Sequence, residues 1–212
     1  MIFSDRRQAG EALAERIAAV PLPGKPLVLG MPRGGLPVAE PVARRLGADL
    51  DIVVARKIGA PGRPEFGVGA IAEDGPPVFD ERNLRYAGVT EADVEQIVIE
   101  EREELRRRIA DYRGGRPAPP VRDRAVVLVD DGLATGVTAR AAISWLRGHG
   151  VGRVLLAVPV CAPAARDLLG ADAEVICLHA PDRFAAVGQW YDDFAQLTDD
   201  DVKGVLSEFI TC

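Results

Sequence analysis

Several short apolar runs, rich in Val, Ile and Leu, constrain the fold of this chain more than any other feature. They show little alternation of polar and apolar residues, which indicates strands that are buried on both faces. Helical segments of 10 to 15 residues separate them, and this order is typical of an α/β fold with a parallel sheet. We predict strands at residues 26–31, 49–56, 125–129, 153–160 and 174–180, and a hairpin from the runs at 68–72 and 76–79.

Helices are predicted between these strands from apolar spacing and from capping residues at their ends. Ser4 or Asp5 could cap the first helix, and a second helix ends at Gly47. Thr90 with Asp93 resembles a capping pair at the start of a long amphipathic helix, whose alternating Glu and Arg residues favour a solvated face. After the first helix, we predict helices over residues 37–46, 90–113, 137–149 and 163–169, and a short helix that begins at about residue 199.

The composition bounds the class of protein. The chain has 212 residues, 48% of them apolar and 27% charged, which suits a single globular domain. The net charge of −6 argues against a nucleic-acid partner, and no apolar run reaches the eighteen residues of a membrane span. The N-terminal residues lack the order of a signal peptide, so we expect a cytoplasmic protein. The three cysteines lack CxxC spacing, which argues against a zinc site.

Three segments of unusual composition, 32–35, 56–67 and 130–138, each follow directly after a predicted strand. The carboxyl ends of parallel strands meet at one edge of a sheet, and ligands of such folds bind there. We therefore expect these three segments to lie on one rim.

The segment VVLVDDGLATGVTA, residues 126–139, carries the most informative chemistry. Gly136 and the small residues around it allow backbone N–H groups to converge before a helix begins, and the hydroxyls of Thr135 and Thr138 add donors for a phosphate. Asp130 and Asp131 suit instead the vicinal hydroxyls of a ribose, or a divalent cation. The segment predicts a sugar-phosphate site; the alternative is that the aspartates only cap an ordinary helix.

This segment resembles the phosphoribosyl-diphosphate (PRPP) signature of the type I phosphoribosyltransferases. The resemblance covers nearly the whole chain and is strongest to a bacterial subgroup with F-x-DR-x-x-AG (3–10), PRGG (32–35), RK-x-GAPG-x-PEF (56–66) and AVG-x-WY-x-DF (186–194). It implies a Rossmann-like parallel-sheet α/β fold in one domain of residues 1–212. That domain would carry a flexible lid at about 59–69, a small hood from 1–10 and 180–212, and a long helix inserted at 90–113.

The resemblance also implies a role for each motif. Asp130 and Asp131 would bind the ribose hydroxyls, directly or through Mg²⁺, and would take part in catalysis with Lys57 and with Arg63 of the lid. The remaining assignments are Ala134, Thr135, Gly136, Val137 and Thr138 for the 5-phosphate, and Arg33, Gly34, Gly35 and Arg56 for the pyrophosphate.

Elementary chemistry agrees with these roles. A leaving pyrophosphate carries several negative charges, which arginine, lysine and Mg²⁺ can balance. A closing lid would keep water from the sugar cation that develops as the bond breaks. The plainer alternatives are that Arg33 and Arg56 form ordinary salt bridges and that Gly34-Gly35 is only a turn.

The acceptor is expected beneath the hood. Phe184, Trp190 and Tyr191 could stack on a base, with Asp192 as a polar neighbour; the alternative is a packed aromatic anchor for the C-terminal helix. The 6-oxopurine enzymes carry a carboxylate one residue before the TG pair, where this chain has Ala134. The acceptor is therefore assigned only as nucleobase-like.

The resulting prediction is an Mg²⁺-dependent phosphoribosyltransferase of nucleotide salvage, which transfers the 5-phosphoribosyl group from PRPP to a nucleobase-like acceptor and releases pyrophosphate. The alternative is a PRPP- or nucleotide-binding regulator with the same fold and little or no turnover. A weaker alternative is a phosphorylase-like or phosphatase-like enzyme. No nucleic acid and no membrane are expected as partners, and the resemblance leaves room for a homodimer.

Overall fold

The computed structural model describes residues 2–209, and the chain divides into two compact units. The first unit comprises Met1–Val53, Ala118–Gly136 and His149–Cys212, and the second comprises Val54–Pro117 and Val137–Gly148. Both segments of the expected hood belong to the first unit, although residues 1 and 210–212 lie outside the described part. The lid and the long helix belong to the second unit. The single domain expected over residues 1–212 stays a prediction.

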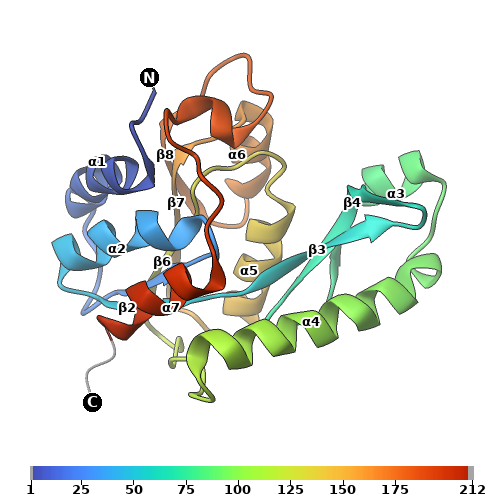
Figure 1. Ribbon diagram of the computed structural model, residues 1–212, viewed down its shortest axis with the longest axis horizontal. Coiled ribbons are helices and arrows are strands. Elements are labelled where there is room, and N and C mark those ends of the chain that lie inside the picture. The colour runs from blue at the N-terminus through green and yellow to red at the C-terminus, as the bar shows by residue number, and fades with distance from the viewer. Residues whose placement is uncertain (1, 210–212) are drawn as a thin grey trace. The chain divides into compact units, whose positions relative to one another are not determined.

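The first unit is built on a five-stranded parallel sheet with the strand order β2-β1-β6-β7-β8 (Figure 1). All residues of β1 and β6 are buried, as the unbroken apolar runs predicted. The predicted parallel sheet is therefore confirmed. Its strands are β1 (Leu27–Gly30), β2 (Asp49–Ile52), β6 (Ala125–Val129), β7 (Arg153–Val160) and β8 (Glu174–His179).

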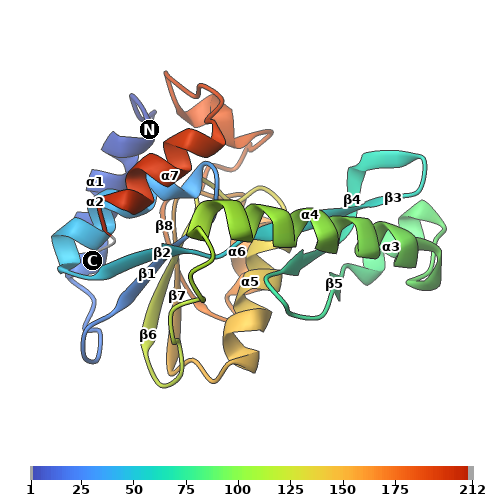
Figure 2. The same ribbon diagram turned by 60° about the horizontal axis from the view of Figure 1, so that its bottom comes forward.

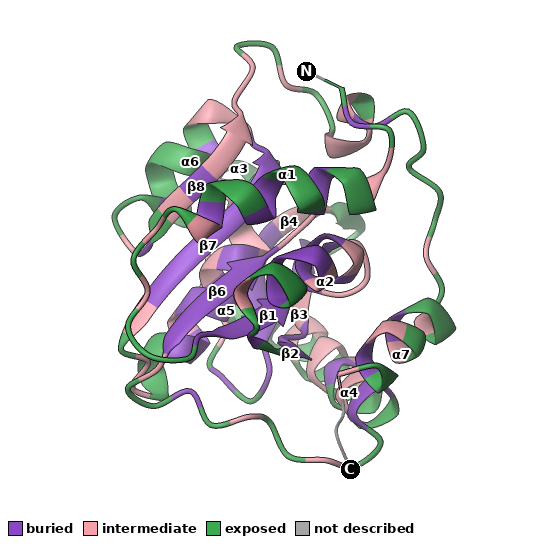
Figure 3. Cartoon of the chain, turned by 90° about the vertical axis from the view of Figure 1, so that its left-hand side faces the viewer, coloured by how far each residue is buried: buried purple, intermediate pink, exposed green. Residues whose placement is uncertain are grey.

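The helices of the first unit lie where the sequence predicted them, although the second begins at Gly35 rather than at Pro37. Asp5 caps the first helix, because its carboxylate accepts a hydrogen bond from the N–H of Gln8 at 2.7 Å. The second helix ends at Gly47, whose φ of +58° lies in the left-handed region that favours glycine. Figure 3 shows the exposed outer face of α1 and the buried strands β6 and β7. These helices are α1 (Arg6–Ala18), α2 (Gly35–Leu46), α6 (Pro163–Leu169) and α7 (Asp199–Ser207), with the 3₁₀ turn η2 (Val187–Trp190).

The strand order creates a switch point between β1 and β6. The sheet continues through β2 on one side of this pair and through β7 and β8 on the other. In open α/β sheets, ligands bind in the crevice at such a point, at the carboxyl ends of the strands. Gly30 lies beside Val129 in the register, so the segments after β1 and β6 start side by side. Two of the three predicted segments, 32–35 and 130–138, thus begin at the same rim.

The second unit contains an antiparallel sheet with the order β3-β4-β5, formed by β3 (Ala55–Ala60), β4 (Arg63–Ala72) and β5 (Val78–Phe79). The pairing of β4 with β5 confirms the predicted hairpin. The turn η1 (Ala92–Val94) and helix α4 (Glu95–Arg113) account for the predicted long helix, and α4 lies along the hairpin of β3 and β4 (Figure 2). Helix α5 (Val137–Gly148) packs against β4. A helix that was not predicted, α3 (Glu81–Ala87), has Asp80 as its cap and Gly88 at its end.

The prediction of one strand over residues 49–56 was wrong in its extent. Parallel pairing in β2 ends at Ile52, and the Val53 amide then donates to the Gly30 carbonyl at 3.1 Å. Val54 instead exchanges bonds with Glu73, which accepts from the Val54 amide through Oε1 and donates to the Val54 carbonyl. The apolar run is continuous, but its second half pairs with β4, so local composition could not reveal the break.

Residues 59–69 form the end of the β3–β4 hairpin, where the family resemblance implied a flexible lid. The pairing shifts its register around Gly59, and the chain turns at Gly62, whose φ is +69°. The many glycines and prolines are thus accommodated by a bulge and a tight turn. The mobility expected of this segment stays a prediction.

Among the helices of residues 2–209, none combines the length and the apolar character that crossing a membrane requires.

Candidate functional site

The acidic pair stands where β6 ends, directly against the glycines that follow β1. A Cβ atom at Gly34 would lie 1.9 Å from Oδ2 of Asp131, and one at Gly35 would lie 2.6 Å from the Val129 carbonyl oxygen. Such distances exclude any side chain at either position unless the neighbours move. The RGG motif and the acidic pair therefore form one packed cluster at the switch point.

Three polar atoms of Asp131 form hydrogen bonds: the carboxylate oxygen Oδ2, the carbonyl oxygen and the amide nitrogen. Its carboxylate Oδ2 accepts a hydrogen bond from Nε of Arg6 at 2.8 Å, and its carbonyl accepts one from the Tyr191 hydroxyl at 2.5 Å. Its amide donates to Oδ1 of Asp130 at 2.9 Å. Asp130, by contrast, forms no ion pair with a cationic side chain within residues 2–209. Asp131 is thus held at three atoms, while the Asp130 carboxylate accepts from the Asp131 amide and is influenced by the charge of Arg6 without a direct ion pair.

The electrostatics of the pair follow from its burial. Burial raises the pKa of Asp130 well above its ordinary value, and the adjacent charge of Asp131 raises it further. Burial also raises the pKa of Asp131, while the hydrogen bond and the charge of Arg6 lower it in part. Burial likewise raises the pKa of the Tyr191 hydroxyl, and the charge of Asp131 adds to this effect. Tyr191 therefore remains a neutral donor to Asp131.

The predicted phosphate loop starts from an anchored residue. The Leu133 amide donates to the Val160 carbonyl at 2.9 Å, and the Leu133 carbonyl accepts from the Ala162 amide at 2.8 Å. Beyond this anchor, Ala134 and Thr135 are exposed, and Gly136 has a φ of +76°. The chain enters α5 at Val137, followed by Thr138, with no acidic residue in the first turn of the helix. An exposed turn and a helix start without carboxylates are features that suit an anion.

Arg33 precedes the two glycines and lies 3.7 Å from Asp199 at the start of α7. The peptide bond between Pro32 and Arg33 is cis. Because the Arg33 side chain is only one-third exposed and its ion pair is long, it is held near the cluster without being neutralised at close range. Its predicted role toward pyrophosphate is compatible with this position and stays a prediction.

The other predicted cations belong to the second unit. Arg56 pairs with Glu101 of α4 at 2.6 Å, which is the salt bridge considered as its plainer alternative. Lys57 is exposed, and its side chain crosses Gly67, where a Cβ would lie 2.7 Å from Cδ of the lysine. Arg63 lies over the Phe66 ring at 5.6 Å and donates to the Ala87 carbonyl at 3.3 Å. The roles assigned to these three cations stay predictions.

The expected hood is held together by backbone bonds and aromatic packing. Phe3 donates through its amide to the Trp190 carbonyl and accepts from the Asp192 amide, both at 2.8 Å. Tyr191 is 6% exposed and packs against Phe3 with ring centroids 5.7 Å apart. These contacts favour the aromatic anchor for Tyr191, one of the two alternatives left open by the sequence.

The other hood candidates are less enclosed. Phe184 and Trp190 are half-buried beside this cluster, and Asp192 is exposed. Nε1 of Trp190 is buried without a hydrogen-bond partner in the described part of the chain, and the Trp190 ring meets His179 edge-on at 4.8 Å. Base binding by Phe184, Trp190 or Asp192 stays a prediction.

Arg6 is the site residue that sequence reasoning did not assign. It lies in the F-x-DR motif, but nothing local to that motif indicates a carboxylate 125 positions later in the chain. One signal could have identified Arg6. It directly follows the helix cap Asp5 and lies on the side of the helix that is otherwise buried.

The acidic pair fits a magnesium ion only in part. Carboxylate oxygens are the ligands that Mg²⁺ prefers, but the ion needs six oxygen ligands and keeps several waters or substrate oxygens. The described residues contain no group of three or more His, Cys, Asp or Glu side chains arranged to hold a metal. The pair could therefore contribute to a Mg²⁺ site that a ligand completes.

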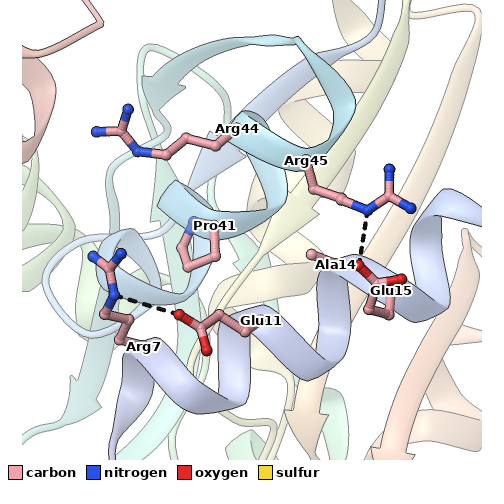
Figure 4. Close-up of a pocket in the computed structure, with 7 residues that line it drawn as sticks. All are labelled: Arg7, Glu11, Ala14, Glu15, Pro41, Arg44 and Arg45. Atoms are coloured by element: carbon pink, nitrogen blue, oxygen red, sulfur yellow. Dashed lines mark hydrogen bonds and ion pairs between the residues drawn. The ribbon is translucent and has the colours of Figure 1, made fainter.

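A separate pocket of about 370 Å³ opens between α1 and α2 (Figure 4). Arg7 points toward Glu11 and Arg45 toward Glu15, and Arg45 and Glu15 approach to 2.8 Å. Ala14 and Pro41 line the pocket between these charged pairs. Arg44 also lines the pocket and pairs with Glu40 and Glu208, so each charged side chain of the lining already forms an ion pair.

This chain is similar in sequence and fold to known proteins. The phosphoribosyl transferase domain family matches residues 6–189. Two Mycobacterium tuberculosis proteins that carry the provisional name phosphoribosyl transferase are 45% identical over 208 residues, 97% of this chain and 46% of each relative. The chain thus spans about half the length of these curated relatives.

Solved structures share the fold. The structure of TT1426 from Thermus thermophilus is 48% identical and covers 100% of both chains with a TM-score of 0.85. A hypoxanthine phosphoribosyltransferase from Staphylococcus aureus is 12% identical, with a TM-score of 0.50 over 87% of this chain and 78% of that chain. The second likeness concerns the fold alone.

Proposed function

Because the chain belongs to the phosphoribosyl transferase family, we propose that it transfers the 5-phosphoribosyl group of PRPP to a nucleobase-like acceptor with release of pyrophosphate. The observation that carries this proposal is the contact between Gly34 and the carboxylate of Asp131 at the switch point. At this contact, the Gly34 backbone can approach a diphosphate, and the Asp131 carboxylate can accept hydrogen bonds from ribose hydroxyls. A substrate that combines both groups is a ribose with a diphosphate on C1.

The reaction needs a well-defined exchange of bonds. The bond between C1 of the ribose and the pyrophosphate oxygen breaks, and the electron pair leaves with pyrophosphate. A nitrogen of the acceptor then bonds to C1 and gives up its proton. In this scheme Asp130 and Asp131 hold the ribose hydroxyls, the segment 134–138 holds the 5-phosphate, and Arg33 with the amides of Gly34 and Gly35 holds the leaving group.

Mg²⁺, when bound with PRPP, would neutralise charge on the pyrophosphate as it leaves. Lys57 and Arg63 would add positive charge, and the hairpin end at 59–69 would exclude water during transfer. The acceptor is assigned to the side of the hood that carries Phe184 and Trp190, which offer apolar faces and one indole N–H donor. A role in nucleotide salvage and a homodimer are parts of the same proposal.

Calorimetric titration of the purified protein with PRPP, in the presence and absence of Mg²⁺, tests the site. We expect saturable binding that is stronger with the metal. Bases are then screened for those that release pyrophosphate from PRPP. No binding of PRPP under either condition would contradict the proposed function.

The alternative of a regulator gains support from one observation: Arg56 and Arg63 are both engaged in contacts within the second unit. It predicts tight PRPP or nucleotide binding without pyrophosphate release for any base. The same two experiments therefore separate the regulator from the enzyme.

A further inference from the structure

Arg6 makes three contacts, one with Asp131 of the acidic pair and two with the segment after Tyr191. Its Nε donates to Oδ2 of Asp131 at 2.8 Å, and its Nη1 donates to the Ala195 carbonyl at 3.0 Å. Its guanidinium also lies 3.8 Å from the centre of the Phe194 ring, within the range of a cation–π contact. With 12% of its side chain exposed, Arg6 is far less accessible than Arg7, the next residue on the same helix, which is 63% exposed.

The oxygen that Arg6 holds is the one that faces the pyrophosphate loop. Oδ2 of Asp131 is the atom closest to the position of a Cβ at Gly34. The same carboxylate oxygen thus accepts the hydrogen bond from Arg6 and lies next to the backbone of Gly34. The Tyr191 hydroxyl fixes the carbonyl of the same residue, so the orientation of Asp131 is determined from three directions.

We propose that Arg6 is a positioning residue that serves as the permanent counter-cation of Asp131, so that the acidic pair selects sugar hydroxyls over a bare divalent cation. This inference rests on the proposed function. Two adjacent carboxylates without a cation attract divalent metals and repel the phosphates of a substrate. With Arg6 in place, one of the two charges is compensated, and the remaining oxygens can still accept hydrogen bonds from a diol.

The contacts with Ala195 and Phe194 explain why an arginine is suited to this position. The planar guanidinium can bind a carboxylate edge, a carbonyl and an aromatic face at once, which a lysine ammonium cannot. The Arg6 side chain therefore links Phe194 and Ala195, which follow Tyr191 in the chain, to Asp131. Lysine at position 6 would retain the charge but lose part of this geometry.

Titration with Mn²⁺ alone tests the selectivity and needs no substrate. Binding is followed by electron paramagnetic resonance for the full chain, for Arg6→Gln and for Arg7→Gln, a matched control on the same helix. We expect no saturable site in the first and third proteins and a new site in Arg6→Gln. Equal Mn²⁺ binding by all three proteins would overturn the proposal.

Titration with PRPP and Mg²⁺ tests the positioning. We expect Arg6→Gln to bind PRPP about 10- to 100-fold more weakly, as for the loss of a charge-assisted hydrogen bond. Arg6→Lys should recover part of the affinity and none of the Mn²⁺ site, while Arg7→Gln should match the unchanged chain. Unchanged PRPP affinity in Arg6→Gln would also overturn the proposal.

The two experiments separate this inference from the proposed function. If the unchanged protein does not bind PRPP, the proposed function fails, and the Mn²⁺ titration still decides whether Arg6 suppresses metal binding. If Arg6→Gln does not fold, as judged from its thermal melting, Arg6→Lys carries the test. Absence of a Mn²⁺ site in Arg6→Lys with weakened PRPP binding would support the proposal, and unchanged PRPP binding would contradict it.

Discussion

At the scale of single residues, the two glycines after Arg33 meet different neighbours. A Cβ at Gly34 would strike the Asp131 carboxylate, a side chain that can be displaced at the cost of its bond to Arg6, whereas a Cβ at Gly35 would strike backbone atoms of Val129 and Asp130. We expect Gly34→Ala to fold but to displace Asp131 and weaken PRPP binding. Gly35→Ala should instead lower the free energy of unfolding, since overpacking costs about 1–3 kcal/mol. Thermal melting and PRPP titration of both variants check this contrast, which equal behaviour would refute.

Asp131 itself allows a test of charge without loss of volume. Asp131→Asn keeps the shape of the side chain but removes the charge that Arg6 pairs with and the acceptor that a ribose hydroxyl would use. We expect PRPP affinity to fall at least about tenfold, equivalent to roughly 1.4 kcal/mol, with little change in melting temperature.

The matched control for this variant is Asp167→Asn, on the exposed side of α6, where the aspartate pairs with Arg166 at the surface. It should leave PRPP binding unchanged. An Asp131→Asn variant with full affinity would remove the acidic pair from the proposed site.

Among the elements, α4 carries a charged face that is paired along the helix only in part. Glu104 pairs with Arg107 and Arg108, as the sequence predicted, whereas Glu101 pairs with Arg56 of β3. Hydrogen bonds from Arg107 and Arg108 lower the pKa of Glu104 to about 2. Since this pKa lies below that of the unfolded chain, the stabilisation is complete above pH 4.5 and is lost as the pH falls toward 2. Glu104 is 29% exposed, so solvent reduces the contribution to about 0.5–1 kcal/mol.

Glu104→Gln should therefore lower the free energy of unfolding at pH 7, and the difference from the unchanged protein should narrow as the pH approaches 3. Urea denaturation at several pH values measures it. Glu103→Gln, at the exposed neighbouring position, is the control. A difference independent of pH would show that the ion pairs do not stabilise α4.

A second element-scale feature is the buried ion pair that joins β4 to the end of α4. Oε2 of Glu73 lies 2.7 Å from Nη1 of Arg113, and both side chains are at most 5% exposed. Removing one buried partner costs about 3–5 kcal/mol, whereas replacing both with apolar groups is often neutral. We expect Glu73→Gln to be strongly destabilised and the double variant with Arg113→Met to recover part of the loss in urea denaturation. A loss below about 1 kcal/mol in the single variant would contradict this expectation.

At the scale of the whole molecule, ligand binding should appear as stability. A ligand at one hundred times its dissociation constant stabilises a protein by about 2.7 kcal/mol, which raises the melting temperature of a chain of this size by roughly 5–10 °C. We expect this shift with PRPP and Mg²⁺ in thermal denaturation. A tenfold weaker affinity leaves about 1.4 kcal/mol of this stabilisation, so the shift should fall by about half or more in Asp131→Asn. Ribose 5-phosphate at the same concentration should also produce a smaller shift. No shift with PRPP would argue against the site in the first unit.

Much of the fold could be predicted because strands and helices depend on neighbouring residues. The buried runs of β1, β6 and β7, the Asp5 cap and the turn at Gly47 are all local effects of side-chain burial, hydrogen bonding and backbone conformation. The position of Asp130 and Asp131 directly after β6 could be predicted in the same way, because the apolar run before them marks the strand. The division of residues 49–56 between two sheets did not, because both halves are equally apolar and differ only in their partners.

The parallel sheet, the family resemblance and the position of Asp130 and Asp131 after a buried strand could all be predicted from the order of the residues. Which charges meet depends on how distant segments pack. Arg6 reaches Asp131 across 125 residues, and Arg56 pairs with Glu101 rather than standing free. Local patterns report the period and the ends of an element, whereas the partner of a charge depends on how distant segments pack. For that reason, the geometry of the acidic pair could be known only from the folded chain.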